Sequence, residues 1–228
     1  MNVFDFLLDR SNWFGPSQIL DLLLQHLYFT VTSVLLAAVV AIPLGILIGH
    51  TGRGSFLVIG LSNAARAIPS LGLLFLAVML LGTGEGNIIV VLAILALPAM
   101  LTATAAGVSG ADREAVHAGR ALGMTERQVV SRVEWPLALP LVVSGLRSAT
   151  LQVVATATVA AFASGGGLGQ LLTSGQAQSD YSQMFAGAVL IAALAIVLDL
   201  LIGLAGWGAA RRARPRSRTA QAAAVAPA

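Results

Sequence analysis

Five long apolar segments divide this chain, and polar or glycine-rich sequence separates them. They cover residues 27–49, 55–81, 87–108, 140–163 and 184–207. Their apolar positions are continuous rather than alternating, which favours helices over the strands of a membrane barrel. Because a helix rises about 1.5 Å per residue, each segment is long enough to cross about 30 Å of hydrocarbon. The pattern predicts an all-α membrane protein with about five transmembrane helices.

Composition agrees with lipid as the surrounding solvent. Hydrophobic residues make up 57% of the chain and charged residues 10%, whereas a soluble domain carries about 25% charged residues. The chain has no cysteine, which excludes disulfides, thiolate metal sites and a cysteine nucleophile. It also has no lysine, so it lacks the glycine-rich phosphate loop followed by lysine that ATPases use. We expect no bound cofactor or metal on this chain.

Arginine placement predicts the orientation in the membrane. The loop at 50–54, segment 109–139 and the C-terminal tail fall on one side of the predicted membrane. That side carries Arg53, Arg113, Arg120, Arg127, Arg132, Arg211, Arg212, Arg214, Arg216 and Arg218. The other side carries only Arg10 outside the predicted helices. The positive-inside rule therefore places the N-terminus outside and the C-terminus in the cytoplasm of a plasma (inner) membrane protein.

The chain divides into three parts. Residues 1–25 are extracytoplasmic; their roughly helical apolar spacing predicts short interfacial helices, with Trp13 and Phe14 at headgroup level, or else a poorly ordered terminus. Residues 26–209 form the transmembrane domain. Residues 210–228 form a basic cytoplasmic tail of low complexity, which we expect to be disordered.

Polar residues interrupt the second apolar segment. Asn63, Arg66, Pro69 and Ser70 fall at membrane depth, where irregular backbone usually lines a cavity, so we take them as candidates for a translocation path. Arg66 would contact a substrate carboxylate transiently, or else belong to a structural pair or extend toward water.

Other polar and small residues within the spans carry further expectations. Gly45 and Gly49 predict close packing of the first span against a neighbour. Arg147 and Asp199 lie at similar depth in the fourth and fifth spans, so we predict that they pair.

The outer end of the fourth span and the ends of the first carry two further signals. Glycines there predict a bend or re-entrant turn near the outer mouth, either a gate or docking loop or a plain flexible loop. These glycines are Gly165, Gly166, Gly167 and Gly169. His26 and His50 fall at opposite ends of the first span, too far apart to share a metal, and we expect both at the membrane interfaces.

Segment 109–139, here called the coupling segment, has the signals of two short helices joined by a tight turn. Asp112 is a good N-cap for a helix from Arg113, and Gly123 is placed to end that helix in the left-handed conformation. Thr125 begins a capping box that starts a second helix. Pro136 and Pro140 are expected to bound a turn back into the membrane.

The coupling segment resembles the "EAA" loop of ABC importer permeases. The run from His117 to Gly123, followed after nine residues by Val133-Glu-Trp-Pro136, matches the spacing of that loop. His117 replaces the family's glutamate and Trp135 its leucine. Glu114, one turn before His117, would supply the missing carboxylate. Five spans with this loop between the third and fourth resemble the type I (MetI-like) importer domain.

The resemblance implies a function and a set of partners. The loop would form the coupling helix, which sits in a cleft of a separate ATPase subunit that binds ATP and magnesium. Ala118, Gly119 and Gly123 would seat that helix. The other coupling residues, which include the polar contacts, would be Glu114, His117, Arg120, Met124, Glu126, Arg127 and Pro136. A second permease, identical or related, would complete the path, and an extracytoplasmic protein would bind the substrate.

A finer resemblance suggests the substrate class. The runs at 67–72, 123–125, 136–140, 144–147 and 165–169 are similar to permeases for glycine betaine, carnitine and choline. An amino acid such as methionine is the alternative substrate, and an ATPase-independent channel or a membrane-embedded enzyme is the alternative class. Trp13, Trp135 and Trp207 fall near predicted interfaces, so we expect no aromatic cage for a quaternary amine.

Overall fold

The computed structural model describes residues 3–15, 18–54, 56, 60, 69–164 and 166–213, and the regular elements these residues form are all helical. In chain order the elements are α1 (Val3–Leu8), η1 (Arg10–Asn12), α2 (Ile19–Thr51), α4 (Ser70–Leu81), α5 (Glu85–Ser109), α6 (Arg113–Ala121), α7 (Glu126–Val129), η2 (Val130–Glu134), α8 (Trp135–Ser164), α9 (Gly169–Gln178) and α10 (Tyr181–Ala213). Element η2 is a π-helical turn.

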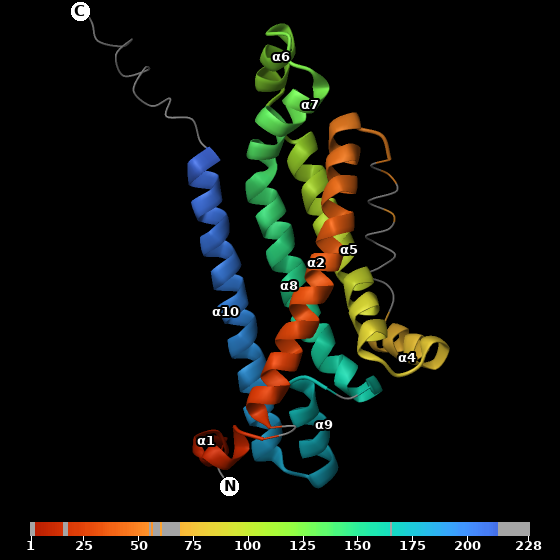
Figure 1. Cartoon of the computed structure of the whole chain (residues 1–228), viewed down its shortest axis with the longest axis vertical. Helices are drawn as coiled ribbons and strands as arrows, with labels where there is room; N and C mark the ends of the chain where they lie inside the picture. The colour runs from red at the N-terminus through yellow and green to blue at the C-terminus, as the bar shows by residue number, and fades with distance from the viewer. Residues whose placement is uncertain are drawn as a thin grey trace, which may run out of the picture.

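The long helices run side by side, and the short ones gather at the two ends of the bundle (Figure 1). Helices α6 and α7 lie at one end, where α10 also finishes; α1 and α9 lie at the other. Within the described residues, four helices are long and apolar enough to cross a membrane: α2, α5, the continuous run from α7 into α8, and α10.

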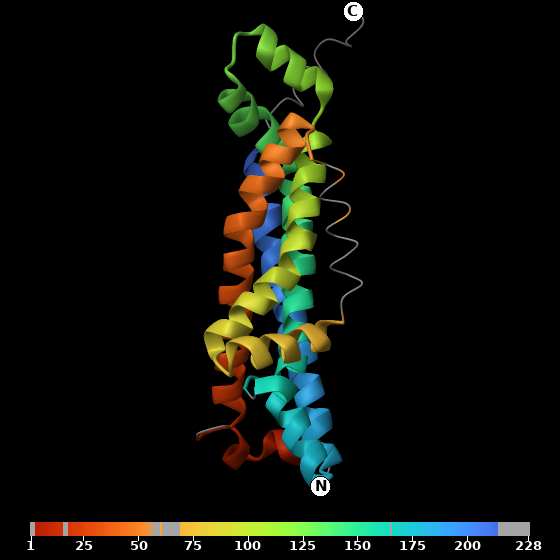
Figure 2. The same cartoon turned by 90° about the vertical axis from the view of Figure 1, so that its right-hand side faces the viewer.

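The first half of the second predicted span, 55–81, lies largely outside the described residues. The described end of this span forms α4, which has 12 residues and lies across the bundle rather than along it (Figure 2). Pro69 is the N-cap of α4, and a helix often begins just after proline because proline has no N–H to donate to a preceding turn. At 12 residues, α4 by itself is too short to span the hydrocarbon.

Helix α2 begins at Ile19, before the predicted start at residue 27. Ile19 and Leu22 are buried with Phe6, Leu168 and Leu171 in an apolar cluster at the end of the bundle opposite α6 and α7. These contacts come from segments distant in sequence, so the extension is a tertiary effect. The indole Nε1 of Trp13 donates to the Leu7 carbonyl at 2.7 Å, which folds the N-terminal segment back on itself.

The expected turn between Pro136 and Pro140 is wrong, because the chain is helical from Glu126 into α8. Pro136 occupies the second position of α8 and Pro140 lies inside it. The π-helical turn η2 leads into the first proline: the Trp135 N–H bonds to the Val130 carbonyl, five residues back. A wider turn at this point accommodates the missing donor at Pro136 without ending the helix.

Helix α5 forms the centre of the bundle, between α2 and α8. Small residues bring α2 and α5 together, as expected for Gly45 and Gly49. A Cβ atom on Gly45 would lie 2.6 Å from Cβ of Thr104, and one on Gly49 would lie 2.7 Å from the Ala105 carbonyl oxygen. Both distances are shorter than van der Waals contact, so only glycine permits this approach.

Substitution of Gly45 by alanine is expected to destabilise the protein by about 1–3 kcal/mol, the usual effect of overpacking a close contact. Gly86, in the first turn of α5, is the matched control because a Cβ there meets nothing within 4 Å. We expect Gly86→Ala to be neutral or slightly stabilising, since alanine favours helix more than glycine does. Thermal unfolding of the two purified variants in detergent measures the difference, and equal effects would contradict the packing argument.

Candidate functional site

The coupling segment folds as predicted, through hydrogen bonds between near neighbours. Asp112 caps α6 by accepting a hydrogen bond from the Glu114 N–H at 2.8 Å. Thr125 and Gln128 form a complete capping box at the start of α7. These contacts confirm the expected helix, turn and helix, which project from one end of the bundle (Figure 1).

Gly123 ends α6 in the left-handed conformation, with φ of 79°. The Met124 N–H bonds to the Gly119 carbonyl and the Gly123 N–H bonds to the Arg120 carbonyl. This pair of bonds is the Schellman arrangement, which satisfies the last carbonyls of a helix and favours glycine at the position after the cap. The chain can therefore reverse within two residues.

The apolar residues of the coupling segment pack against one another. Gly119 is buried, and a Cβ there would lie 3.3 Å from Sδ of Met124 and 3.6 Å from Cγ2 of Val133. Val129 is fully buried. The absence of a side chain at Gly119 thus lets α6 approach both Met124 and η2 closely, so the segment has the internal packing of a rigid unit. Of the residues expected to seat α6 in a partner, Ala118 and Gly123 are exposed.

Charged side chains link the two short helices. Arg120 makes two hydrogen bonds of 3.0 Å to the carboxylate of Glu126, and this contact raises the pKa of the Arg120 guanidinium. Glu114, His117 and Arg127 are exposed. They leave the outer surface of the coupling segment rich in charge.

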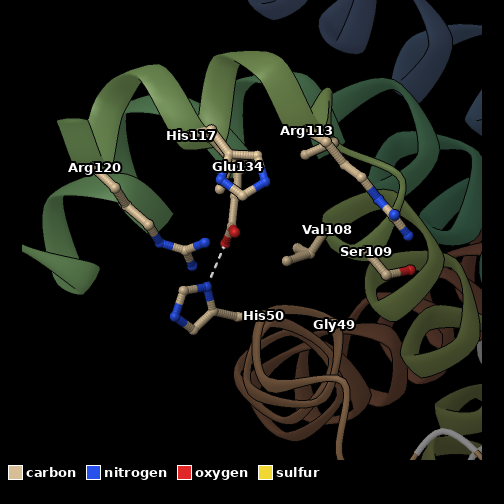
Figure 3. A pocket seen from close by; sticks show the side chains of 10 residues that line it. Gly49, His50, Val108, Ser109, Arg113, His117, Arg120 and Glu134 are labelled. Carbon is tan, nitrogen blue, oxygen red and sulfur yellow. Dashed lines mark hydrogen bonds and ion pairs between the residues drawn. The ribbon is translucent and has the colours of Figure 1, made fainter.

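A pocket of about 270 Å³ opens between the coupling segment and the adjacent ends of α2 and α5 (Figure 3). It is lined by Gly49, His50, Val108, Ser109, Ala111, Arg113, Val116, His117, Arg120 and Glu134. His50 lies inside it with Nδ1 2.7 Å from Oε2 of Glu134. His50 and Glu134 were not among the predicted site residues. The glutamate within the run Val133–Pro136 was the available signal in the sequence. Its partner could not be read from the pattern, because His50 lies 84 positions away.

The glycine loop at the other end of the bundle is held by α2. The Gly167 N–H donates to Oε1 of Gln25 at 2.8 Å, and the Leu168 N–H donates to Nδ1 of His26 at 3.2 Å. His26 is fully buried, so its ring is enclosed by protein rather than exposed to water or lipid. Gly166 and Gly167 have φ of 117° and 63°. Both glycines are packed against α2, unlike the residues of a plain flexible loop.

Helix α9 follows this loop and was not predicted. It starts at Gly169, which sits so close to the Thr158 carbonyl of α8 that a Cβ could not fit. Gly165 lies outside the described residues.

The predicted pair between the fourth and fifth spans is confirmed. Arg147 Nε donates to Asp199 Oδ1 at 2.6 Å and Nη2 donates to Oδ2 at 2.5 Å. Both oxygens of the carboxylate are engaged, which is the strong planar geometry of an arginine–carboxylate pair. The pair joins α8 to α10 within the membrane-spanning part of the bundle.

The candidate path residues are only partly described. Asn63 and Arg66 lie outside the described residues. Pro69 is the N-cap of α4 and Ser70 is its first residue, at the end of the bundle opposite the coupling segment.

Comparison with known proteins supplies the family. A model described as "Binding-protein-dependent transport system inner membrane component" matches residues 41–206. The glycine betaine/carnitine/choline transport system permease protein OpuCB of Bacillus subtilis (strain 168) is 33% identical over 180 residues, which cover 79% of this chain and 83% of that protein. The osmoprotectant import permease protein OsmW of Salmonella typhimurium (strain LT2) is 33% identical over 207 residues, which cover 89% and 94%.

A solved structure shares the fold. A chain of the MetNI methionine ABC transporter, solved in inward-facing conformations, superimposes with a TM-score of 0.69 and is 25% identical. The match covers 83% of this chain and 93% of that one. Fold and sequence thus agree on an all-helical, multi-pass transport permease rather than an enzyme. The chain belongs to the family of binding-protein-dependent transport system inner membrane components.

Proposed function

We propose that this chain is the permease subunit of an ABC importer for a quaternary-amine osmoprotectant such as glycine betaine, carnitine or choline. The observation that carries the proposal is the agreement among its relatives: OpuCB and the choline permease OpuBB of Bacillus subtilis are both 33% identical over about four fifths of the chain. The methionine importer matches at 25% identity, so methionine has less support as the substrate.

The coupling segment supplies the mechanical contact in this proposal. A separate ATPase hydrolyses ATP, and its closure moves a segment that is rigid because of its internal packing. Its exposed residues, Glu114, His117, Ala118, Gly123 and Arg127, face that partner. Arg120 and Glu126 hold the two short helices in register. The motion passes directly to α5 and α8, which are covalently continuous with the segment, as rigid-body coupling requires.

The proposal extends to the rest of the assembly. This chain contributes half of the translocation path, and a second permease contributes the other half. The coupling segment and the end of α10 lie in the cytoplasm, while α1 and α9 face an extracytoplasmic binding protein that selects the substrate. The arginine distribution supports this orientation, because the basic loops and tail then all lie inside.

Uptake of labelled glycine betaine under salt stress tests the substrate. The chain is expressed with its co-transcribed genes in cells that lack other osmoprotectant uptake. We expect uptake that an excess of unlabelled choline or carnitine competes, and that an excess of methionine does not. An assembled complex that takes up methionine but no quaternary amine would overturn the assignment while keeping the family.

A further inference from the structure

The imidazole of His50, in the last turn of α2, lies between two carboxylates of the coupling segment. Its Nδ1 is 2.7 Å from Oε2 of Glu134, and its Nε2 is 3.3 Å from Oε2 of Glu126. His50 and Glu134 are 84 positions apart in the chain. The contact therefore joins two elements, α2 and η2, that no short stretch of backbone connects.

Burial makes this contact energetically important to both elements. Glu134 is only 4% exposed, and a carboxylate removed from water needs a partner to compensate its lost hydration. The side chain of His50 is 16% exposed, so the histidine itself is largely enclosed. Figure 3 shows the two side chains pointing toward each other across the pocket.

Both ring nitrogens of His50 lie beside carboxylates. Nδ1 is within hydrogen-bonding distance of Glu134, and Nε2 faces Glu126. Glu126 also receives two hydrogen bonds from Arg120. The result is a continuous polar chain from α2 through α7 to α6.

We propose that His50 is a positioning residue that ties the first span to the coupling segment, so that the segment moves α2 together with α5 and α8. The backbone continues from the segment into α5 and α8, but α2 is separated from it in sequence and needs a side-chain connection. The proposal rests on the proposed function, because it takes this segment as the contact with the ATPase.

Variants at this position should still assemble. Gly49 packs so closely on α5 that a Cβ there would lie 2.7 Å from Cβ of Val108, which keeps the end of α2 in place when the imidazole is changed. The informative quantity is therefore not the amount of complex but the substrate moved for each ATP hydrolysed. A merely structural role would lower the amount of complex and leave that ratio unchanged.

The test uses the complete importer in proteoliposomes, with its ATPase and binding protein, and measures glycine betaine uptake and ATP hydrolysis together. For His50→Ala we expect uptake per ATP to fall by about fivefold or more, the lower end of usual coupling between sites. Thr51→Ala, the exposed neighbour on the same helix, is the matched control and should keep the ratio. An unchanged ratio in His50→Ala would overturn the proposal.

A second set of variants addresses the buried charge. If His50→Ala assembles poorly, the double variant His50→Leu with Glu134→Leu replaces the pair by apolar groups of similar size that cannot hydrogen-bond. We expect it to assemble and to lose the same share of uptake per ATP. In addition, Glu134→Ala and His50→Ala should not be additive, because each removes the same contact; full additivity would also overturn the proposal.

The outcome for the wild-type importer separates the two proposals. If it hydrolyses ATP but takes up no quaternary amine, the proposed substrate is wrong. The His50 contact is then judged from the increase in ATP hydrolysis on adding the binding protein. That increase should be smaller in His50→Ala than in Thr51→Ala, and an equal increase would overturn the contact's role.

Discussion

Substitution of Gly123 by aspartate is expected to reduce osmoprotectant uptake by about tenfold or more, a coupling loss within the usual range of 1–3 kcal/mol. Gly123 ends α6 with φ of 79° and lies at the turn of the coupling segment. Aspartate adds a negative charge and a side chain at the exposed tip of the segment, where we propose that the ATPase binds. Uptake of labelled glycine betaine, normalised to the amount of permease in the membrane, measures the effect.

Strain within this chain would lower the amount of folded permease, and uptake normalised to that amount corrects for it. A Cβ on Gly123 would meet nothing within 4 Å, so the side chain fits, and the left-handed conformation costs a residue other than glycine about 1–2 kcal/mol. Gly52 is a matched control, because it ends α2 in the left-handed conformation, with φ of 68° and ψ of −2°, and a Cβ there also meets nothing within 4 Å. Gly52 lies outside the coupling segment, directly after the first span.

The comparison between the two glycines is decisive. Gly52→Asp carries a comparable local strain and the same charge, and we expect it to retain most of the uptake. If both variants lose uptake equally, the cause is backbone strain or poor insertion of the permease into the membrane. The coupling turn then has no special role. If Gly123→Asp transports as well as the unsubstituted chain, the proposed contact with the ATPase at this turn is wrong.

Substitution of Arg147 by alanine is expected to lower the amount of intact permease severalfold. The guanidinium makes two short hydrogen bonds to Asp199, and its loss leaves a carboxylate at membrane depth without that partner. A lone charge at this depth is costly. Fluorescence-detected size-exclusion chromatography of detergent-extracted membranes measures the amount of folded protein. Ser148→Ala, at the exposed neighbouring position, should have little effect.

Double variants distinguish the ion pair from other effects of the arginine. Arg147→Asp combined with Asp199→Arg keeps both charges and should recover most of the folded protein. Arg147→Met combined with Asp199→Leu should recover it as well, since two apolar side chains carry no desolvation cost in lipid. A charge-exchanged variant that is no better folded than either single variant would show that the pair does not stabilise the bundle.

The coupling segment shows which features can be read from local sequence. Asp112, Gly123 and Thr125 act on backbone groups within five residues of themselves, so the cap, the turn and the capping box follow from residue types and spacing. The Arg147–Asp199 pair was predictable for a different reason: lipid penalises an unpaired charge, which leaves few choices of partner at the same depth.

Other features depend on contacts between distant segments. The early start of α2 and the presence of α9 both rest on burial around Leu168 and Leu171, which come together only in the folded bundle. Pro136 and Pro140 were read as a turn because proline usually ends a helix, but a π-helical turn accommodates the first of them.

The sequence by itself determined the solvent, the helical class, the sidedness of the charges and the local structure of the coupling segment, because apolar run length, arginine placement and capping chemistry act over short distances. Only the tertiary structure decided that His26 is buried beneath the glycine loop and that His50 joins the first span to the coupling segment. Those contacts link residues 142 and 84 positions apart, and packing of α2 against α5 and α8 is what brings them within hydrogen-bonding distance.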